Sequence, residues 1–473
     1  MALHELEKRA PTDVVVTATR PRSRHRVHDI GRGGEHFHRN ASALILNTGI
    51  SGGLGMAFWF LAARHYSDPD VGRGSAVISA LMMLAGLIAV NAAGTVNRFI
   101  PKAGRHTTAV VAWAHILTVT VIAVLALAFL GTLEWWGPSF DLLRSPEMAL
   151  WFCIAAVAVS VITIQENVLT ALRASIWVPV ANALFGVGKV VLLVVLAATF
   201  PRSGVFFAWV IPMIVVMVPL TLLIFGWLVP RHIRTYAHVF DVTRAEIGRF
   251  FAADYLGALF LFGTIFLVPV LVATRVEPHT YAYFYVAWSL AGVMSVVGNN
   301  MATSLAVEGV YDAPRLAENC RSALSRGLFL LLVGAVAVSL IAPYGLGLLG
   351  AGYVDAVPLL QLLAFATLPR AIVDIYIGVL RARGDGVQIA RLQALRGVLV
   401  MGVVVTILYF VDEPFGIHTI TAVGVAVLVG QLIAMLVALP GLAQLLGWRP
   451  DDRVMANVSI TSAERITLLA DRS

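Results

Sequence analysis

Charged residues are scarce in this sequence. Asp, Glu, Lys and Arg make up 13% of its 473 residues, whereas 59% are hydrophobic. A water-soluble fold could not cover its surface with so few polar side chains. The composition therefore excludes a soluble globular domain and predicts that lipid surrounds most of the chain.

Cysteine is nearly absent as well. The two cysteines, Cys153 and Cys320, cannot form a disulfide framework, and both are expected to be structural. Histidines near the N-terminus are irregularly spaced and have no Cys companions: His25, His28, His36 and His38. This spacing does not fit a metal site, so we predict no metal and no cofactor.

Long hydrophobic runs, by contrast, recur along the chain. A membrane-spanning helix needs about 20 mainly apolar residues, and short joints rich in Pro, Gly, Asp and Arg separate twelve such runs. The predicted spans are 41–64, 74–98, 108–131, 149–173, 177–199, 204–229, 248–273, 280–304, 323–343, 356–380, 388–410 and 418–446. The predicted fold class is an all-α polytopic membrane protein.

The positions of the basic residues decide what the net charge of +7 means. Of the 34 lysines and arginines, 27 lie in the two tails and the even-numbered joints, and only five lie in the odd-numbered joints. Basic loops stay in the cytoplasm. We therefore predict a multi-pass protein of the cell inner (cytoplasmic) membrane with both termini cytoplasmic, and no nucleic-acid partner.

The chain also contains a weak internal repeat. A shift of 208 to 210 residues aligns 172–174 with 380–382, both Leu-Arg-Ala, and brings Lys189 near Arg396. Six helices of equal orientation in each half indicate a parallel repeat. The predicted divisions are a disordered basic cytoplasmic tail (1–40), an N-terminal six-helix lobe (41–229), a cytoplasmic linker (230–247), a C-terminal six-helix lobe (248–446) and a cytoplasmic tail (447–473).

Two basic residues lie deep inside predicted spans, where a charge costs on the order of several kcal/mol. At about 1.5 Å per residue, Lys189 and Arg370 are roughly 20 Å and 16 Å from the cytoplasmic ends of their helices. Asp374 stands four residues after Arg370, so the two can pair, and a paired arginine can still donate to a phosphate. Lys189 has no charge at such spacings and needs a partner from another helix, either Glu166 or a ligand.

Several segments between about residues 40 and 447 form a recognisable series, in this order: Leu61-Ala-Ala-Arg64, Arg98-Phe-Ile-Pro101, Gln165-Glu-Asn167, Asn182-Ala-Leu-Phe-Gly-Val-Gly-Lys189, Asp254-Tyr-Leu-Gly257 and Ala282-Tyr-Phe-Tyr285. With these segments the chain resembles the polysaccharide transporter family of the MOP flippase superfamily, whose Wzx-like members are lipid-linked oligosaccharide flippases.

This resemblance implies twelve helices in two six-helix lobes with a MATE-like parallel repeat. It also implies alternating access by a cavity that accepts the headgroup of a polyprenyl-pyrophosphate-linked oligosaccharide or related cell-envelope glycolipid. The positions expected to line the headgroup cavity are Lys189, Arg370, Arg98, Glu166 and Asn167. Coupling or gating is expected from Asp254, Asp374 and Glu308, and the cytoplasmic mouth is expected at Arg173 and Arg381. The implied partners are the lipid-linked glycan, membrane lipids, and a glycan polymerase or glycosyltransferases.

Two other functions stay open at this stage. A cation-coupled multidrug exporter has the same fold and would use Asp254 or Asp374 as its coupling carboxylate. An integral-membrane glycosyltransferase or ligase would need acid and base residues beside an external acceptor site. The longest outer joint, 131–147, holds only scattered carboxylates. We therefore predict a transporter without catalytic residues rather than an enzyme.

Overall fold

The computed structural model describes residues 51–100, 103–235, 263–311, 313–410 and 419–447, all within one compact unit that spans Asn47–Ser473. Every regular element in these ranges is helical, and no strand occurs in them. Ten of the helical segments are long and apolar enough to cross a membrane. The predicted all-α polytopic fold is thereby confirmed.

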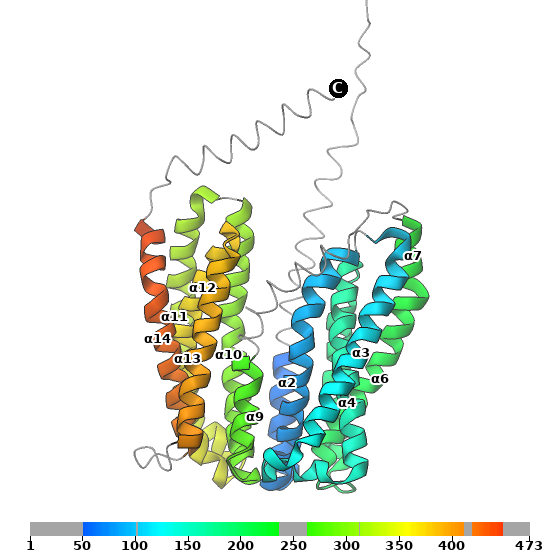
Figure 1. The fold of residues 1–473 in the computed structure, drawn as a ribbon. Helices are drawn as coiled ribbons and strands as arrows, with labels where there is room; N and C mark the ends of the chain where they lie inside the picture. Colours follow the sequence, from blue (N-terminus) through cyan, green and yellow to red (C-terminus); the bar gives the residue numbers. More distant parts are fainter. Residues whose placement is uncertain (1–50, 101–102, 236–262, 312, 411–418, 448–473) are drawn as a thin grey trace, which may run out of the picture. The chain divides into compact units, whose positions relative to one another are not determined.

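The first group of helices follows a helix over residues 51–65. Contacts join α2 to α4, α3 to α4, α4 to α6, and α5 to α6. The Ser67 side chain accepts a hydrogen bond from the Asp70 backbone N–H at the start of α2, and Ser145 does the same for Met148 at the start of α4. The group comprises α2 (Asp68–Phe99), α3 (Thr107–Gly131), α4 (Pro146–Ala171), α5 (Trp177–Leu196), α6 (Gly204–Leu223) and α7 (Val229–Thr235), with a π-helical turn at Ile224–Leu228 before α7 (Figure 1).

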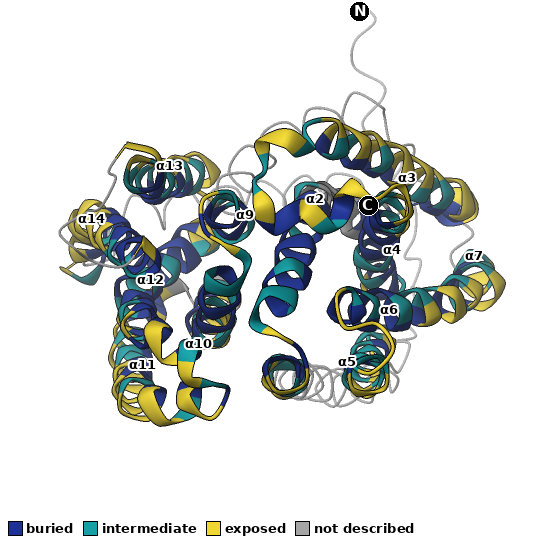
Figure 2. Cartoon of the chain, turned by 90° about the horizontal axis from the view of Figure 1, so that it is seen from below, coloured by how far each residue is buried: buried dark blue, intermediate teal, exposed yellow. Residues whose placement is uncertain are grey.

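The second group is arranged around α12. This helix packs against α10, α11 and α14, and α13 packs against α14. The burial pattern reflects that position, since most of the second half of α12 is buried (Figure 2). The group comprises α9 (Val268–Ala273), α10 (Pro278–Tyr311), α11 (Leu316–Gly347), α12 (Val357–Arg383), α13 (Gly386–Phe410) and α14 (Thr419–Gly447), with a π-helical turn at Gly263–Leu267 before α9.

Peripheral helices expose large apolar side chains. On α3, Trp113 is 68% exposed, and on α11, Phe329 is 66% exposed. Figure 2 shows exposed residues along both helices. Such surfaces are unfavourable in water and favourable against lipid chains. The fold therefore belongs in a bilayer, with α2 and α12 as its most buried spans.

The observed helices agree closely with the predicted spans. Two of the twelve predicted spans, 41–64 and 248–273, lie partly outside the described residues, which accounts for the ten complete spans. The first residues of the predicted linker, 230–235, are helical and belong to α7. Its remaining residues, 236–247, lie outside the described part of the chain, and the division into tails and lobes stays a prediction.

The two groups of helices meet where α2 and α10 begin. The Tyr283 hydroxyl donates a 2.6 Å hydrogen bond to Asp68 Oδ2, and the hydroxyls of Ser79 and Tyr281 are hydrogen-bonded at 2.7 Å. At Gly72 a Cβ atom would lie 1.6 Å from the carbonyl oxygen of Pro278, so only glycine allows this approach. The charge asymmetry of the joints predicts that these helix ends are on the outer side of the membrane.

Candidate functional site

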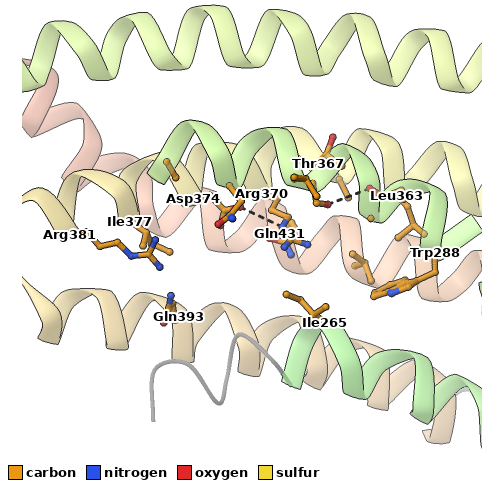
Figure 3. A pocket seen from close by; sticks show the side chains of 18 residues that line it. Ile265, Trp288, Leu363, Thr367, Arg370, Asp374, Ile377, Arg381, Gln393 and Gln431 are labelled. Atoms are coloured by element: carbon orange, nitrogen blue, oxygen red, sulfur yellow. Dashed lines mark hydrogen bonds and ion pairs between the residues drawn. The ribbon is translucent and has the colours of Figure 1, made fainter. Parts of the chain in front are cut away.

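A cavity of about 370 Å³ lies within the second group of helices. Its wall is formed by α10, α12, α13 and α14, together with Ile265 (Figure 3). Much of that wall is apolar, as in most ligand pockets, with a few polar groups that could fix an orientation. Those polar groups are Ser295, Asn299, Thr367, Arg370, Asp374, Arg381, Gln393 and Gln431.

One face of α12 supplies most of the charge in the cavity. Its lining residues recur every three or four positions, the spacing of one helix face: Leu363, Ala366, Thr367, Arg370, Asp374, Ile377 and Arg381. Arg370 is at the midpoint of α12, thirteen residues from each end. At about 1.5 Å per residue it is roughly 20 Å from either end, near the middle of the bilayer.

Three charged side chains form a cluster at this depth. Arg396 Nη1 on α13 donates a 2.6 Å hydrogen bond to Asp374 Oδ1. Arg370 Nε lies 3.5 Å from Asp374 Oδ2, which confirms the predicted pair four residues apart. Figure 3 shows Arg370 and Asp374 directed toward one another. The cluster leaves one net positive charge in the described residues around it.

Three buried polar atoms in or beside the cavity have no hydrogen-bond partner in the described part of the chain. Arg370 Nε and Gln431 Oε1 belong to lining residues, and Arg396 Nε lies behind the lining. A buried polar atom without a partner costs about 1–3 kcal/mol. Arg396 and Gln431 are each 2% exposed, so bulk solvent does not satisfy these groups. The lining is therefore suited to a polar, hydrogen-bonding occupant.

Lys189, the other predicted mid-membrane charge, lies in the first group of helices. Its Nζ is 5.4 Å from the centroid of the Phe58 ring and 5.1 Å from that of Phe185, both cation–π distances. The anticipated bridge to Glu166 is not formed, since the side chain of Asn182 hydrogen-bonds with Glu166 instead. In the described residues no carboxylate lies within ion-pair distance of Lys189.

The internal repeat relates these two places. Asp374 follows Glu166 by 208 residues, and Arg396 follows Lys189 by 207. In the first half the acid is on α4 and the base on α5, and in the second half the acid is on α12 and the base on α13. The same acid–base couple is thus present in both halves, paired in the second and separate in the first.

The other predicted site residues are scattered. Asn167 donates a 2.8 Å hydrogen bond to the Thr163 carbonyl oxygen within α4. Arg173 and Glu308 are exposed, and Arg381 is exposed at one end of the cavity. Arg98 belongs to α2, but its side chain lies outside the described residues, as does the whole of Asp254. Among the residues that are described, no group of three His, Cys, Asp or Glu side chains could hold a metal ion.

Sequence reasoning missed three residues of the cavity region: Arg396, Gln393 and Gln431. Arg396 is 2% exposed within α13, although it was counted with the basic cytoplasmic joint that precedes this helix. Its alignment with Lys189 was a signal that it belongs inside the membrane. The two glutamines carried no comparable signal, because isolated amides are common in spanning helices.

Known structures share this fold. An inward-facing multidrug resistance MATE family transporter of the MOP superfamily matches with a TM-score of 0.58 and 16% identity, over 84% of this chain and 94% of that chain. An outward-facing one matches with a TM-score of 0.51 and 14% identity, over 87% and 96%. A MOP superfamily transporter from Pyrococcus furiosus matches with a TM-score of 0.52 and 14% identity, over 86% and 96%.

No protein-family model matches the sequence, and no curated protein matches it significantly. At identities of 14% to 16% the likeness establishes the fold and leaves the cargo open. The chain has the fold of MATE-type transporters of the MOP superfamily, as the sequence predicted. The Pyrococcus furiosus transporter is described as having a binding pocket of reverse polarity that suggests a different function.

Proposed function

We propose that this protein is a flippase or exporter that translocates a polyprenyl-pyrophosphate-linked oligosaccharide, or a related cell-envelope glycolipid, across the cytoplasmic membrane by alternating access. The observation that carries the proposal is the charge of the cavity in the second group of helices. Two arginines, Arg370 and Arg381, line it, and the one carboxylate among its described lining residues, Asp374, is already hydrogen-bonded to Arg396. Such a surface attracts an anionic group.

A diphosphate suits this surface chemically. A guanidinium presents parallel N–H donors that match phosphate oxygens, and the neighbouring amides add further donors. Lys189, whose ammonium lies over the rings of Phe58 and Phe185, offers a second cationic point in the other group of helices. A flippase needs no catalytic residues, because it makes and breaks no covalent bond.

The second candidate is a cation-coupled multidrug exporter, which the fold of the MATE family transporters favours. In that function Asp374 or Asp254 would bind the coupling cation. Two guanidiniums close to Asp374 disfavour this role for it, because a cation would compete with charges already in place. Asp254 lies outside the described residues.

Depletion of the protein in its native host distinguishes the two functions. For the flippase, we expect a lipid-linked oligosaccharide to accumulate on the cytoplasmic leaflet while surface glycan disappears. Complementation with the wild-type chain should restore surface glycan, whereas the Arg370→Gln chain, at equal membrane abundance, should not. Unchanged glycan combined with drug hypersensitivity would favour the multidrug exporter instead.

A further inference from the structure

Arg370 and Arg396 make different contacts with the same carboxylate. Arg396 is 2% exposed, hydrogen-bonds to Asp374 Oδ1 at 2.6 Å and does not line the cavity. Arg370 is 23% exposed, lies 3.5 Å from Oδ2 and lines the cavity. Its Nε has no close hydrogen-bond partner among the described residues, and its contact with Asp374 is a 3.5 Å ion pair. Only Arg370 is thus in a position to change its partner without breaking a short buried bond.

The donors of Arg370 are sufficient for a second anion. A guanidinium carries five N–H groups in a fixed fork, and one carboxylate oxygen at 3.5 Å uses little of that capacity. A phosphate group in the cavity could accept two parallel hydrogen bonds from this fork. Gln431 and Thr367 line the same wall, so a polar anion there would meet further hydrogen-bonding groups.

The internal repeat also distinguishes Arg370 from the Asp374–Arg396 pair. Asp374 follows Glu166 by 208 residues and Arg396 follows Lys189 by 207, so an acid and a base lie at nearly equivalent positions in both halves of the chain. The position that corresponds to Arg370 under a shift of 208 residues is Ile162, which is apolar. Arg370 is therefore an addition to a repeated couple and has no counterpart in the first half.

Asp374 also has a clear electrostatic task. Without it, two guanidiniums would face each other in a low-dielectric interior, and like charges there repel strongly. Held by Arg396 through one oxygen, Asp374 keeps its other oxygen beside Arg370. It can thereby orient the Arg370 fork while leaving the cavity with a net positive charge.

We propose a division of labour in which Arg370 is the group that contacts the anionic part of the substrate, and the Asp374–Arg396 pair is a fixed support that positions it. This inference rests on the proposed function, since it assigns roles within the same cavity. It makes Asp374 a positioning residue rather than the carboxylate that binds a coupling cation.

The test is equilibrium binding of inorganic diphosphate to the purified full chain in detergent, measured by calorimetry. Arg370→Gln should weaken binding about 10- to 100-fold, as expected for the loss of one or two charge-assisted hydrogen bonds. Arg370→Lys should recover part of the affinity, because the charge is kept and the fork is lost. Arg391→Gln, which removes an exposed arginine of α13, is the matched control and should bind like the wild type.

The support is tested by making it neutral. The double variant Asp374→Asn/Arg396→Gln can keep an amide-to-amide hydrogen bond between the two helices. Its dissociation constant for diphosphate should be within about threefold of the wild-type value, a smaller change in binding free energy than the loss of one charge-assisted hydrogen bond would cause. If the double variant does not fold, Arg396→Lys makes the comparison, because it keeps the charge beside Asp374 and loses the guanidinium fork; its affinity should also stay within about threefold of the wild type. The assignment is overturned if Arg370→Gln binds normally, or if neutralising the support weakens binding as much as Arg370→Gln does.

These outcomes are separate from those of the proposed function. Normal diphosphate binding with the predicted order of variants, but no effect of depletion on lipid-linked glycan, would remove the glycan substrate and leave the division of labour intact. Accumulation of lipid-linked glycan on depletion, with no difference in diphosphate binding among the variants, would support the glycan substrate and overturn the division of labour. Absence of saturable diphosphate binding to the wild type would overturn the assignment as well.

Discussion

Replacing Arg396 by Gln should destabilise this protein much more than replacing Arg370 by Gln. Arg396 is 2% exposed and 2.6 Å from Asp374. Removing one partner of a buried ion pair costs about 3–5 kcal/mol, because the remaining charge is left uncompensated. Arg370 still lies beside Asp374 and offsets part of that cost, so the lower end, about 3 kcal/mol, is the better expectation.

The corresponding cost at Arg370 is small. Its contact with Asp374 is 3.5 Å long and is partly exposed to the cavity. Removing Arg370 leaves Asp374 paired with Arg396 and relieves the repulsion between the two guanidiniums, so the cost should be about 0–1 kcal/mol. The two variants should therefore differ by roughly 2 kcal/mol in the free energy of unfolding.

The assay is denaturant unfolding of the purified chain in detergent micelles, followed by loss of helical circular dichroism. Arg391→Gln, on the same helix as Arg396 but exposed, is the control and should change the free energy of unfolding by no more than about 0.5 kcal/mol. Equal destabilisation by Arg370→Gln and Arg396→Gln would refute the distinction between a fixed and an available guanidinium.

Three further predictions concern the rest of the helix framework. Tyr283→Phe removes the 2.6 Å hydrogen bond to Asp68, which contributes about 1.5–3 kcal/mol because its acceptor is charged. A cysteine placed at the start of α10 should then react faster with a thiol reagent. Unchanged reactivity would show that this contact does not hold the helices together. Gly72→Ala places a Cβ atom 1.6 Å from the Pro278 carbonyl oxygen and should separate α2 from α10 still further, visible as a longer spin-label distance than in Tyr283→Phe. Lys189→Met removes an ammonium that lies over the rings of Phe58 and Phe185. The variant should keep or raise thermal stability while surface glycan falls, and normal glycan would exclude the lysine from the transport path.

The sequence predicted those parts of the fold that depend on local patterns. Apolar length located the spans, and their observed ends mostly differ by a few residues from the predicted ones. The Arg370–Asp374 contact was also predictable, because residues four apart on a helix face the same side.

Local sequence patterns did not predict the contacts between helices. The Arg396–Asp374 bond joins residues 22 positions apart on two helices, and nothing in the local pattern around residue 396 distinguishes a loop-flanking arginine from a buried one. The sequence predicts that Lys189 needs a partner from another helix, either Glu166 or a ligand, and does not predict its position over the rings of Phe58 and Phe185. Both cases depend on which faces of neighbouring helices meet, and hydropathy does not specify that.

The charges of the cluster also bear on the choice between the two candidate functions. Buried ion pairs seldom add stability over apolar residues of the same size, so a cluster with two cations and one anion in mid-membrane is poorly explained by stability alone. A cationic drug or coupling cation entering this cavity would have to compete with a guanidinium for Asp374. A diphosphate needs only to take the place of one carboxylate oxygen, 3.5 Å away, beside Arg370. Binding of the anion therefore requires the smaller rearrangement, because Arg370 changes its partner while the short Arg396–Asp374 hydrogen bond stays in place.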